Sequence, residues 1–321
     1  MKTLVLGATS LVGSHFVASK RGAGIEAVDI EDPRQKGLQV EKYVNLDLSR
    51  EDDVRELIRT SPCDAVVNFV ARTDVDGCEK ERPLDTSSPA KKGSAGSAWR
   101  LNGELPGWLA EETAMRDMFL IHLSTDFVFD GSSGPYREDA LPDPLGPQVS
   151  WYGYTKGLGE VRVLAANDKG SALIRLSYPY RSQFQGKLDF ARNLVAKHKE
   201  GKLYPLYSDQ KMTPTWIPDI TNAIEALLSS KAAGVYHVAS PIVTTPYEFA
   251  KSLFTELGLD TGALRSSQLK GKTTTGVAPR PLIGGLEVKN VRSLGVEPKS
   301  YLEGIRTLAR EVSAGSRMED P

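Results

Sequence analysis

The chain has 321 residues, of which 40% are hydrophobic and 25% charged, and its formal net charge is -1. This composition is that of an ordinary globular protein with enough interior for one large core or two domains, and it excludes disordered and collagen-like classes. The near-neutral balance gives no electrostatic reason to expect a nucleic-acid partner.

Cysteine content and hydropathy bear on the compartment. The cysteines, Cys63 and Cys78, form no CxxC pair, so we expect a reducing cytoplasmic environment. No stretch approaches the roughly 18 apolar residues that a membrane span needs, and no cleavable leader is recognisable, so we expect no membrane partner.

The first half of the chain alternates short β-branched runs with longer amphipathic segments, which is typical of parallel strands joined by crossover helices. It predicts the α/β fold class, with a Rossmann-like doubly wound parallel sheet in an NAD(P)-binding domain at residues 1–175. In chain order the predicted strands are Thr3–Leu6, Ile25–Asp29, Ala65–Val70, Phe119–Ser124 and Ala172–Arg175, and the predicted helices are Leu11–Lys20, Arg50–Arg59 and Leu105–Thr113.

Two further regions lack this alternation. The segment Asp85–Ser97 is rich in Ser, Gly, Ala and Pro and is predicted to be a mobile loop. Residues 176–321 mix short elements with frequent prolines and end in an amphipathic helix over Tyr301–Val312. We expect a smaller mixed α/β lobe that binds substrate, with some segments returning to the Rossmann domain.

A glycine-containing turn joins the first strand to the first helix. Gly7 permits the tight turn and Gly13 lets the helix pack closely on the strand, so the N–H groups at the helix start face a dinucleotide pyrophosphate. Ser10 stands where a middle glycine is usual, and its hydroxyl can donate to a phosphate. An ordinary strand, turn and helix without a ligand is the alternative interpretation.

Carboxylates at strand ends suggest how the nucleotide is held. Asp29 ends the second predicted strand, where it can accept from the ribose hydroxyls and favours NAD(H). Arg34 and Lys36 follow closely and can offset repulsion of a 2'-phosphate, so NADP(H) stays an alternative. Asp47 is placed to reach the adenine amino group or, equally well, to act as a turn or cap residue.

Tyr152 and Lys156 are four residues apart and therefore share one face of a predicted helix. A nearby ammonium lowers the pKa of a phenol, which predicts Tyr152 as the general acid and Lys156 as the group that lowers its pKa and holds the nicotinamide ribose. Thr125, at the end of the fourth predicted strand, would hydrogen-bond the carbonyl oxygen. Tyr154 is a competing candidate, but it is offset from the face of the lysine.

The histidines show no metal-ligand spacing. His122 lies in a predicted strand and His237 lies beside Val238, so both are expected to be core or semi-buried residues, while His15 and His198 lie on helices. We expect no bound metal.

Taken together, these residues resemble the extended short-chain dehydrogenases, and within them the dTDP-4-dehydrorhamnose reductase family, over nearly the whole chain. The segments that carry the resemblance are GATSLVGS from Gly7, VVNFVARTDVDGCE from Val66, STDFVFDG from Ser124, PYRED from Pro135, YGYTKGLGE from Tyr152, SDQKMTPTWIPDI from Ser208, GVYHVAS from Gly234 and RPL from Arg280.

The resemblance implies NAD(P)H-dependent reduction of a nucleotide-linked 4-keto-6-deoxy sugar, as in rhamnose biosynthesis, by a chain that resembles homodimeric enzymes. The implied substrate contacts are Thr73, Val75, Asp126 and Phe127, with an Asx-type cap as the alternative role for Asp126. Together with the residues discussed above, the expected cofactor-lining positions are Gly7, Thr9, Ser10, Leu11, Val12, Asp29, Ile30, Asp47, Leu48, Val70, Ala71, Tyr152, Lys156, Ser177 and Tyr178.

Departures and rival functions concern the substrate. Phe127 stands where the family usually has tyrosine, which removes a hydroxyl that can contact the sugar. A 4,6-dehydratase would need a carboxylate pair after Thr125, and Phe127 cannot serve. A sugar-nucleotide epimerase that uses the same residues, and a non-catalytic NADP-binding regulatory subunit, stay open as alternatives.

Overall fold

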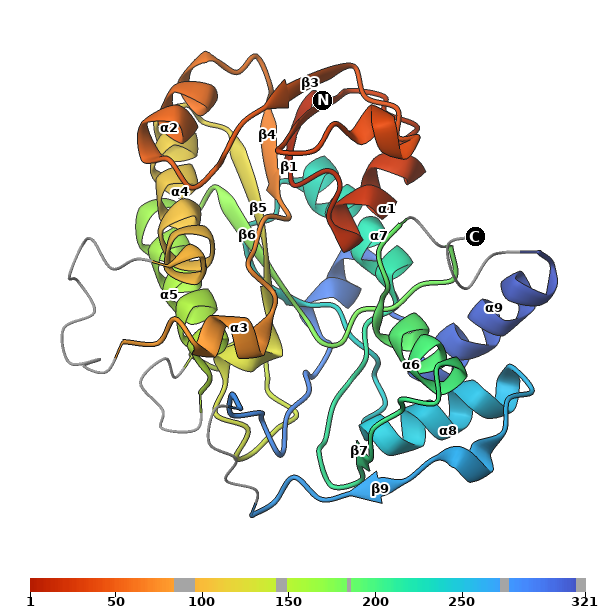
Figure 1. Cartoon of the computed structure of the whole chain (residues 1–321). Helices are drawn as coiled ribbons and strands as arrows, with labels where there is room; N and C mark the ends of the chain where they lie inside the picture. The colour runs from red at the N-terminus through yellow and green to blue at the C-terminus, as the bar shows by residue number, and fades with distance from the viewer. Residues whose placement is uncertain (84–95, 143–148, 184–185, 272–276, 316–321) are drawn as a thin grey trace.

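The computed structural model describes residues 1–83, 96–142, 149–183, 186–271 and 277–315. Within these ranges seven parallel strands form one sheet in the order β3-β2-β1-β4-β5-β6-β8 (Figure 1). The order runs outward from β1 in both directions, which confirms the predicted Rossmann-like fold. The strands are β1 (Thr3–Leu6), β2 (Ile25–Asp29), β3 (Lys42–Asn45), β4 (Ala65–Asn68), β5 (Phe119–Thr125), β6 (Ser171–Leu176) and β8 (Gly234–His237).

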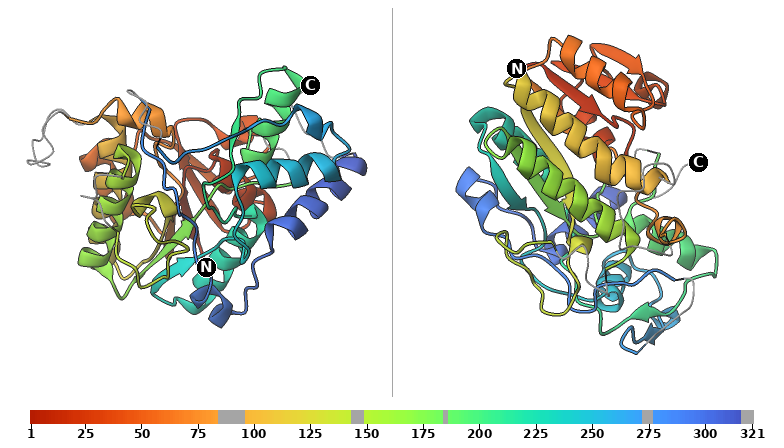
Figure 2. Two further views of the ribbon diagram at one scale, coloured as in Figure 1. Left: turned by 90° about the horizontal axis from the view of Figure 1, so that it is seen from below. Right: turned by 90° about the vertical axis from the view of Figure 1, so that its left-hand side faces the viewer.

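Helices cover both faces of the sheet. One core cluster packs α1 and α7 against it, and a second packs α2, α4 and α5 against the opposite face. Figure 2 (right) shows α4 and α5 lying side by side across that second face. These helices are α1 (Leu11–Ser19), α2 (Glu51–Thr60), α4 (Leu105–Met115), α5 (Trp151–Asn167) and α7 (Ile217–Ser230).

A C-terminal lobe has its own apolar core, built around Tyr180, Trp216 and Phe249. The later chain also returns to the sheet, because β8 pairs with β6 and α7 covers β5 and its neighbours. A division at residue 175 stays a prediction. The elements of the lobe are α6 (Phe190–Lys199), α8 (Pro246–Glu256), α9 (Tyr301–Ser313) and the paired strands β7 (Leu206–Tyr207) and β9 (Ser266–Ser267). The short helix α3 (Val75–Glu79) belongs to the sheet side of the molecule and faces the lobe (Figure 1).

Predicted and observed elements agree to within a few residues where the pattern was long. The strands β3 and β8 were not predicted, because both are short and neither alternates clearly between apolar and polar residues. The loop expected over Asp85–Ser97 lies outside the described residues except for its last two. Of these, Ser97 is hydrogen-bonded to Glu81.

Across the described ranges, no helix combines the length and the apolar character needed to cross a membrane.

Candidate active site

The turn after β1 requires glycine at two positions. Gly7 has a positive φ of 78°, and a Cβ there would lie 3.0 Å from Val70 Cγ2. A Cβ on Gly13 would lie 2.3 Å from the carbonyl oxygen of Gly7. The first turn of α1 therefore sits directly against the end of β1, as close approach to a pyrophosphate requires.

Ser10 caps α1. Its hydroxyl oxygen accepts from the Gly13 N–H at 3.1 Å, which leaves the hydroxyl proton available to a ligand. The N–H groups of Leu11 and Val12 begin the helix and have no intrahelical acceptor. Together these donors form an anion site at the positive end of the helix dipole.

Asp29 braces this turn. Its Oδ2 accepts from the Thr9 N–H at 2.8 Å and from the Thr9 hydroxyl at 2.9 Å, and its Oδ1 accepts from the Ile30 N–H at 2.8 Å. Oδ2 thus has both lone pairs in use, and Oδ1 retains one for a ribose hydroxyl. Ile30, one of the expected cofactor-lining positions, is 68% exposed and offers an apolar surface next to Asp29.

The basic residues after β2 are already engaged with carboxylates. Arg34 pairs with Asp32 at 2.6 Å, and Lys36 lies 3.7 Å from Glu31. Lys36 also lines a small pocket next to the glycine turn between β1 and α1. The other residues that line it are Thr9, Ser14, Glu31, Leu38, Gly186 and Lys187. Lys36 and Lys187 border this pocket and can balance the charge of a 2'-phosphate, so the geometry fits both NAD(H) and NADP(H).

Asp47 is exposed and forms a turn. Its Oδ1 accepts from the Ser49 N–H at 3.0 Å, and this hydrogen bond lowers the pKa of Asp47. The geometry matches the turn role that the sequence left open. Leu48 beside it is buried, and Val70 and Ala71 are half-buried just beyond β4.

The predicted catalytic residues come together at the carboxyl end of β5. Thr125 is the last residue of β5, and its side chain lies close enough to the Tyr152 phenol to lower the pKa of that group. Tyr152 and Lys156 lie one helical turn apart on α5, whose N-terminus is capped by Ser150, and both side chains are buried. Tyr154 instead stacks on Trp151 at 4.8 Å between ring centroids.

Burial governs the ionisation of this group. It raises the pKa of Tyr152 well above the ordinary value, and the nearby Thr125 side chain only partly opposes it. The predicted lowering of the Tyr152 pKa by Lys156 is not found, because the Lys156 amino group is turned to the Leu123 carbonyl oxygen at 2.6 Å and to His122 Nε2 at 3.2 Å. Burial also lowers the pKa of Lys156 to about 8.

Phe127 is wedged between two tyrosines. Its ring lies 5.7 Å from that of Tyr152, edge to face, and 6.1 Å from that of Tyr178. The Tyr178 hydroxyl accepts from Gln210 Nε2 at 3.1 Å, and its backbone has a positive φ of 42°. Phe127 therefore packs against both phenols, while its contact with the sugar stays a prediction.

Asp126 and Ser177 are also brought together. The Ser177 hydroxyl donates to Asp126 Oδ2 at 2.7 Å, and the backbone of Gly285 also hydrogen-bonds the carboxylate. Burial raises the pKa of Asp126 to about 6, against these hydrogen bonds. The carboxyl group is thus held by the C-terminal lobe rather than by its own loop alone.

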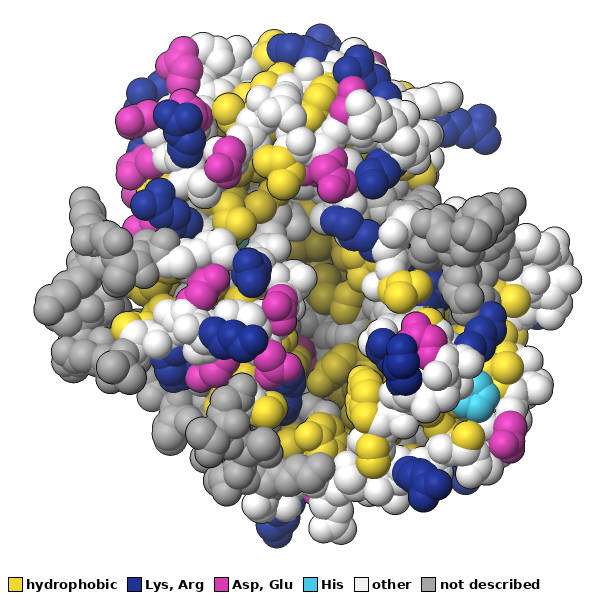
Figure 3. Space-filling view, viewed as in Figure 1, with side chains coloured by type: hydrophobic (Ala, Val, Ile, Leu, Met, Phe, Trp, Pro, Cys, Tyr) yellow, Lys and Arg dark blue, Asp and Glu magenta, His cyan; other side chains and the backbone are white. Residues whose placement is uncertain are grey.

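Two of the predicted sugar contacts lie at the start of α3. Thr73 is exposed just before this helix, and Val75 begins it. Arg280 of the C-terminal segment pairs with Asp76 at 2.9 Å and so ties the two sides together. Figure 3 shows a hollow in this face of the molecule with hydrophobic side chains along it.

Two side chains that contact the predicted site residues or their neighbours had no sequence pattern that marked them as part of the site. Asn68, at the end of β4, and Gln210, inside the SDQKMTPTWIPDI segment, were not predicted as site residues.

His122 and His237 are fully buried, which confirms them as core residues. No cluster of three His, Cys, Asp or Glu side chains suited to a metal ion occurs in the part of the chain that the structure describes.

The glycine turn after β1, the parallel sheet and the tyrosine and lysine one turn apart on α5 define an extended short-chain dehydrogenase/reductase. Within that class the chain belongs to the family described as RmlD substrate binding domain, whose model matches residues 1–314.

Individual relatives cover almost the whole chain. It is 31% identical to the spore coat polysaccharide biosynthesis protein SpsK of Bacillus subtilis, over 98% of both chains. It is 31% identical to the probable low-salt glycan biosynthesis reductase Agl14 of Haloferax volcanii, over 91% of both chains. The crystal structure of dTDP-4-dehydrorhamnose reductase from Bacillus anthracis in complex with NADP superposes with a TM-score of 0.73 at 22% identity, over 97% of this chain and 99% of that one.

Proposed function

We propose that this chain is an NAD(P)H-dependent reductase that acts on the keto group of a nucleotide-linked 4-keto-6-deoxy sugar. The observation that carries the proposal is that Thr125, Tyr152 and Lys156 are all buried at the carboxyl end of β5, the same edge of the parallel sheet at which the glycine turn follows β1. The names of Agl14 and of the Bacillus anthracis enzyme, both reductases, support the same reaction type.

The residues present suit a nicotinamide dinucleotide. The close contact between Gly13 and the end of β1, and the N–H groups of Leu11 and Val12, fit a pyrophosphate. Asp29 would hold the adenosine ribose and Lys156 the nicotinamide ribose. When bound, this cofactor supplies the hydride for the reduction.

The chain's own side chains supply the proton and polarise the carbonyl. Because burial keeps Tyr152 protonated at neutral pH, its hydroxyl is a proton donor to the substrate oxygen rather than a base. Thr125 donates a hydrogen bond to the same oxygen as negative charge develops there. Phe127 and Tyr178 exclude water from this volume.

The test is a Tyr152→Phe variant assayed with NADH and NADPH against a panel of nucleotide-linked 4-keto sugars. We expect kcat to fall on the order of 10² to 10⁴-fold, the usual contribution of a positioned acid. Tyr154→Phe is the matched control and should keep its turnover, because Tyr154 stacks on Trp151. Near-normal turnover by Tyr152→Phe would refute the assignment of the proton donor.

A further inference from the structure

A chain of three polar side chains runs behind the active site, across β4, β5 and α5. Asn68 Nδ2 lies 3.0 Å from His122 Nδ1, and His122 Nε2 lies 3.2 Å from Lys156 Nζ. Asn68 and His122 face each other in register on adjacent strands. All three side chains are buried, Asn68 and His122 completely, so each polar atom depends on its protein partner.

The orientation of Asn68 is fixed by the backbone. The Val70 N–H donates to Asn68 Oδ1 at 3.0 Å, so the amide oxygen faces Val70 and the NH₂ group faces the histidine. The reverse orientation would place NH₂ against N–H. His122 Nδ1 must therefore accept from Asn68, and in the neutral ring the proton lies on Nε2.

The Nε2 proton points at Lys156. An ammonium group has three donors and no acceptor, so a protonated Lys156 would place one N–H against another. A neutral amine has a lone pair that accepts from His122 Nε2–H, while one of its own N–H groups donates to the Leu123 carbonyl oxygen at 2.6 Å. Only the neutral amine satisfies every hydrogen bond in the chain.

The surrounding charges do not reverse this preference. Glu160, one turn further on α5, raises the pKa of Lys156, but its carboxylate is held by Arg175 of β6 at 2.7 Å. Tyr152, one turn earlier, is protonated because burial raises its pKa. Burial lowers the pKa of Lys156 to about 8, in the same direction as the hydrogen-bond pattern. Burial keeps the pKa of His122 well below its ordinary value, and a positive charge on Lys156 would lower it further, so the His122 ring is neutral in either case.

We propose that Asn68 and His122 are positioning residues that fix the Nε2–H tautomer of His122 and thereby favour the neutral amine of Lys156 over its ammonium form in the enzyme before substrate binds. The proposal rests on the proposed function only for the role of Lys156 in the site. A lysine held this way orients its remaining N–H toward the cofactor and exchanges protons readily near neutral pH.

The first experiment uses the full chain without cofactor or substrate. Long-range ¹H–¹⁵N NMR of histidine-labelled protein identifies the tautomer of His122, with His122→Gln assigning its signals. We expect the proton on Nε2, and a proton on Nδ1 would overturn the proposal. Titration of the ¹⁵Nζ signal of Lys156, assigned with Lys156→Arg, should give a midpoint at or below about 8, and a midpoint near the ordinary value of about 10.4 would also overturn it.

The second experiment changes the chain of hydrogen bonds. In His122→Gln the side-chain oxygen can accept from an ammonium without adding charge, so we expect the Lys156 midpoint to rise by about one pH unit or more. Asn68→Asp, which accepts from both Val70 and His122, should reverse the tautomer and raise the midpoint further. Leu120→Met, on the same face of β5, is the control and should leave it unchanged.

An unchanged midpoint in a folded His122→Gln protein would refute the proposal. If that variant does not fold, the tautomer measured in the wild-type protein still decides. Because no turnover is measured, failure here is distinct from failure of the Tyr152→Phe test of the proposed function.

Discussion

The Thr125 hydroxyl interacts both with Tyr152 and with the backbone of the loop that follows β5. Besides its interaction with Tyr152, its oxygen accepts from the Phe127 N–H at 3.3 Å and so begins the short helical turn after β5. The side chain therefore sets the path of the loop that carries Asp126 and Phe127. A polar group with both roles should respond to substitution in activity more than in stability.

We expect Thr125→Val to lower kcat on the order of 10² to 10³-fold, the effect typical of losing one donor to a developing oxyanion. Thr125→Ser keeps the hydroxyl and should retain activity to within about tenfold. Steady-state kinetics of both variants, with thermal unfolding to confirm that each is folded, make the comparison. Equal activity of the Val and Ser variants would contradict the assigned role.

Asp126 gives a pH dependence of stability. Its pKa is raised from 3.8 to about 6 in the folded state by burial, so between these values the folded state binds more protons than the unfolded state. The free energy of unfolding therefore falls as pH rises through this window, and the cost of the charge is fully present above about pH 6.

Asp126→Asn removes that cost. Relative to wild type, its free energy of unfolding should rise with pH across the same window by an amount on the order of 3 kcal/mol, and then level off. Urea denaturation at a series of pH values measures the difference, with the exposed Asp139→Asn as the matched control. A difference that does not change with pH would show that Asp126 is not held in a neutral form.

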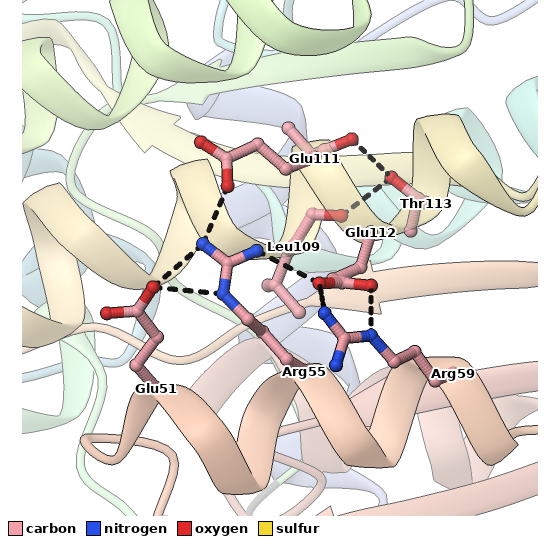
Figure 4. A network of polar contacts seen from close by, with 8 residues as sticks. Glu51, Arg55, Arg59, Leu109, Glu111, Glu112 and Thr113 are labelled. Carbon is pink, nitrogen blue, oxygen red and sulfur yellow. Dashed lines mark hydrogen bonds and ion pairs between the residues drawn. The ribbon is translucent and has the colours of Figure 1, made fainter.

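At the level of elements, α2 and α4 are joined by a network of ion pairs on the face away from the site. Arg55 contacts Glu51, Glu111 and Glu112, and Arg59 contacts Glu112 (Figure 4). Glu112 is almost completely buried. Burial opposes its charge, yet the hydrogen bonds from Arg59 and Arg55 keep the pKa of Glu112 below its ordinary value.

The two glutamates on α4 should therefore differ. Glu112→Gln removes the buried charge that Arg55 and Arg59 share and should cost on the order of 2 kcal/mol, less than a fully buried pair because Arg59 is exposed. Glu111→Gln should cost less than about 1 kcal/mol, and that cost should shrink at high salt. Chemical denaturation of both variants at low and high salt tests this, and equal costs would contradict it.

For the whole molecule, the sequence predicted what depends on local pattern. The glycine turn at Gly7, the pair Tyr152 and Lys156, and Thr125 at a strand end each have a local signature, and the structure places each where the fold class requires. The role of Asn68 depends on its register with His122 across two strands, which no local pattern reveals. The raised pKa of Tyr152 was also missed, because burial is a property of the folded chain.

The same limit applies to β8 and α7. The apolar face of α7, with Ile217, Ile220, Ile224 and Leu227, packs against the sheet in the same cluster as Phe16 of α1. These residues follow a segment of the C-terminal lobe, so nothing local marks them as part of the first domain. The core of the sheet is completed only after the chain has visited the lobe.

A fragment ending at residue 175 should consequently fail to fold. It would expose the sheet face that α7 covers, and the loss of several buried apolar side chains at about 1.5 to 3 kcal/mol each exceeds the stability of a typical domain. Circular dichroism and urea denaturation of this fragment, next to the full chain, provide the measurement. Cooperative unfolding with near-native stability would contradict the expectation.

The route of the chain also constrains how relatives can be recombined. It leaves the sheet after β6, returns for α7 and β8, leaves for α8, returns to the core of the sheet with residues 286–296, and leaves again for α9. A chimera with the lobe of one relative and the nucleotide-binding half of another therefore needs five junctions, with the three lobe segments exchanged together. A change of substrate preference is therefore reached more readily by point substitutions than by shuffling of whole halves.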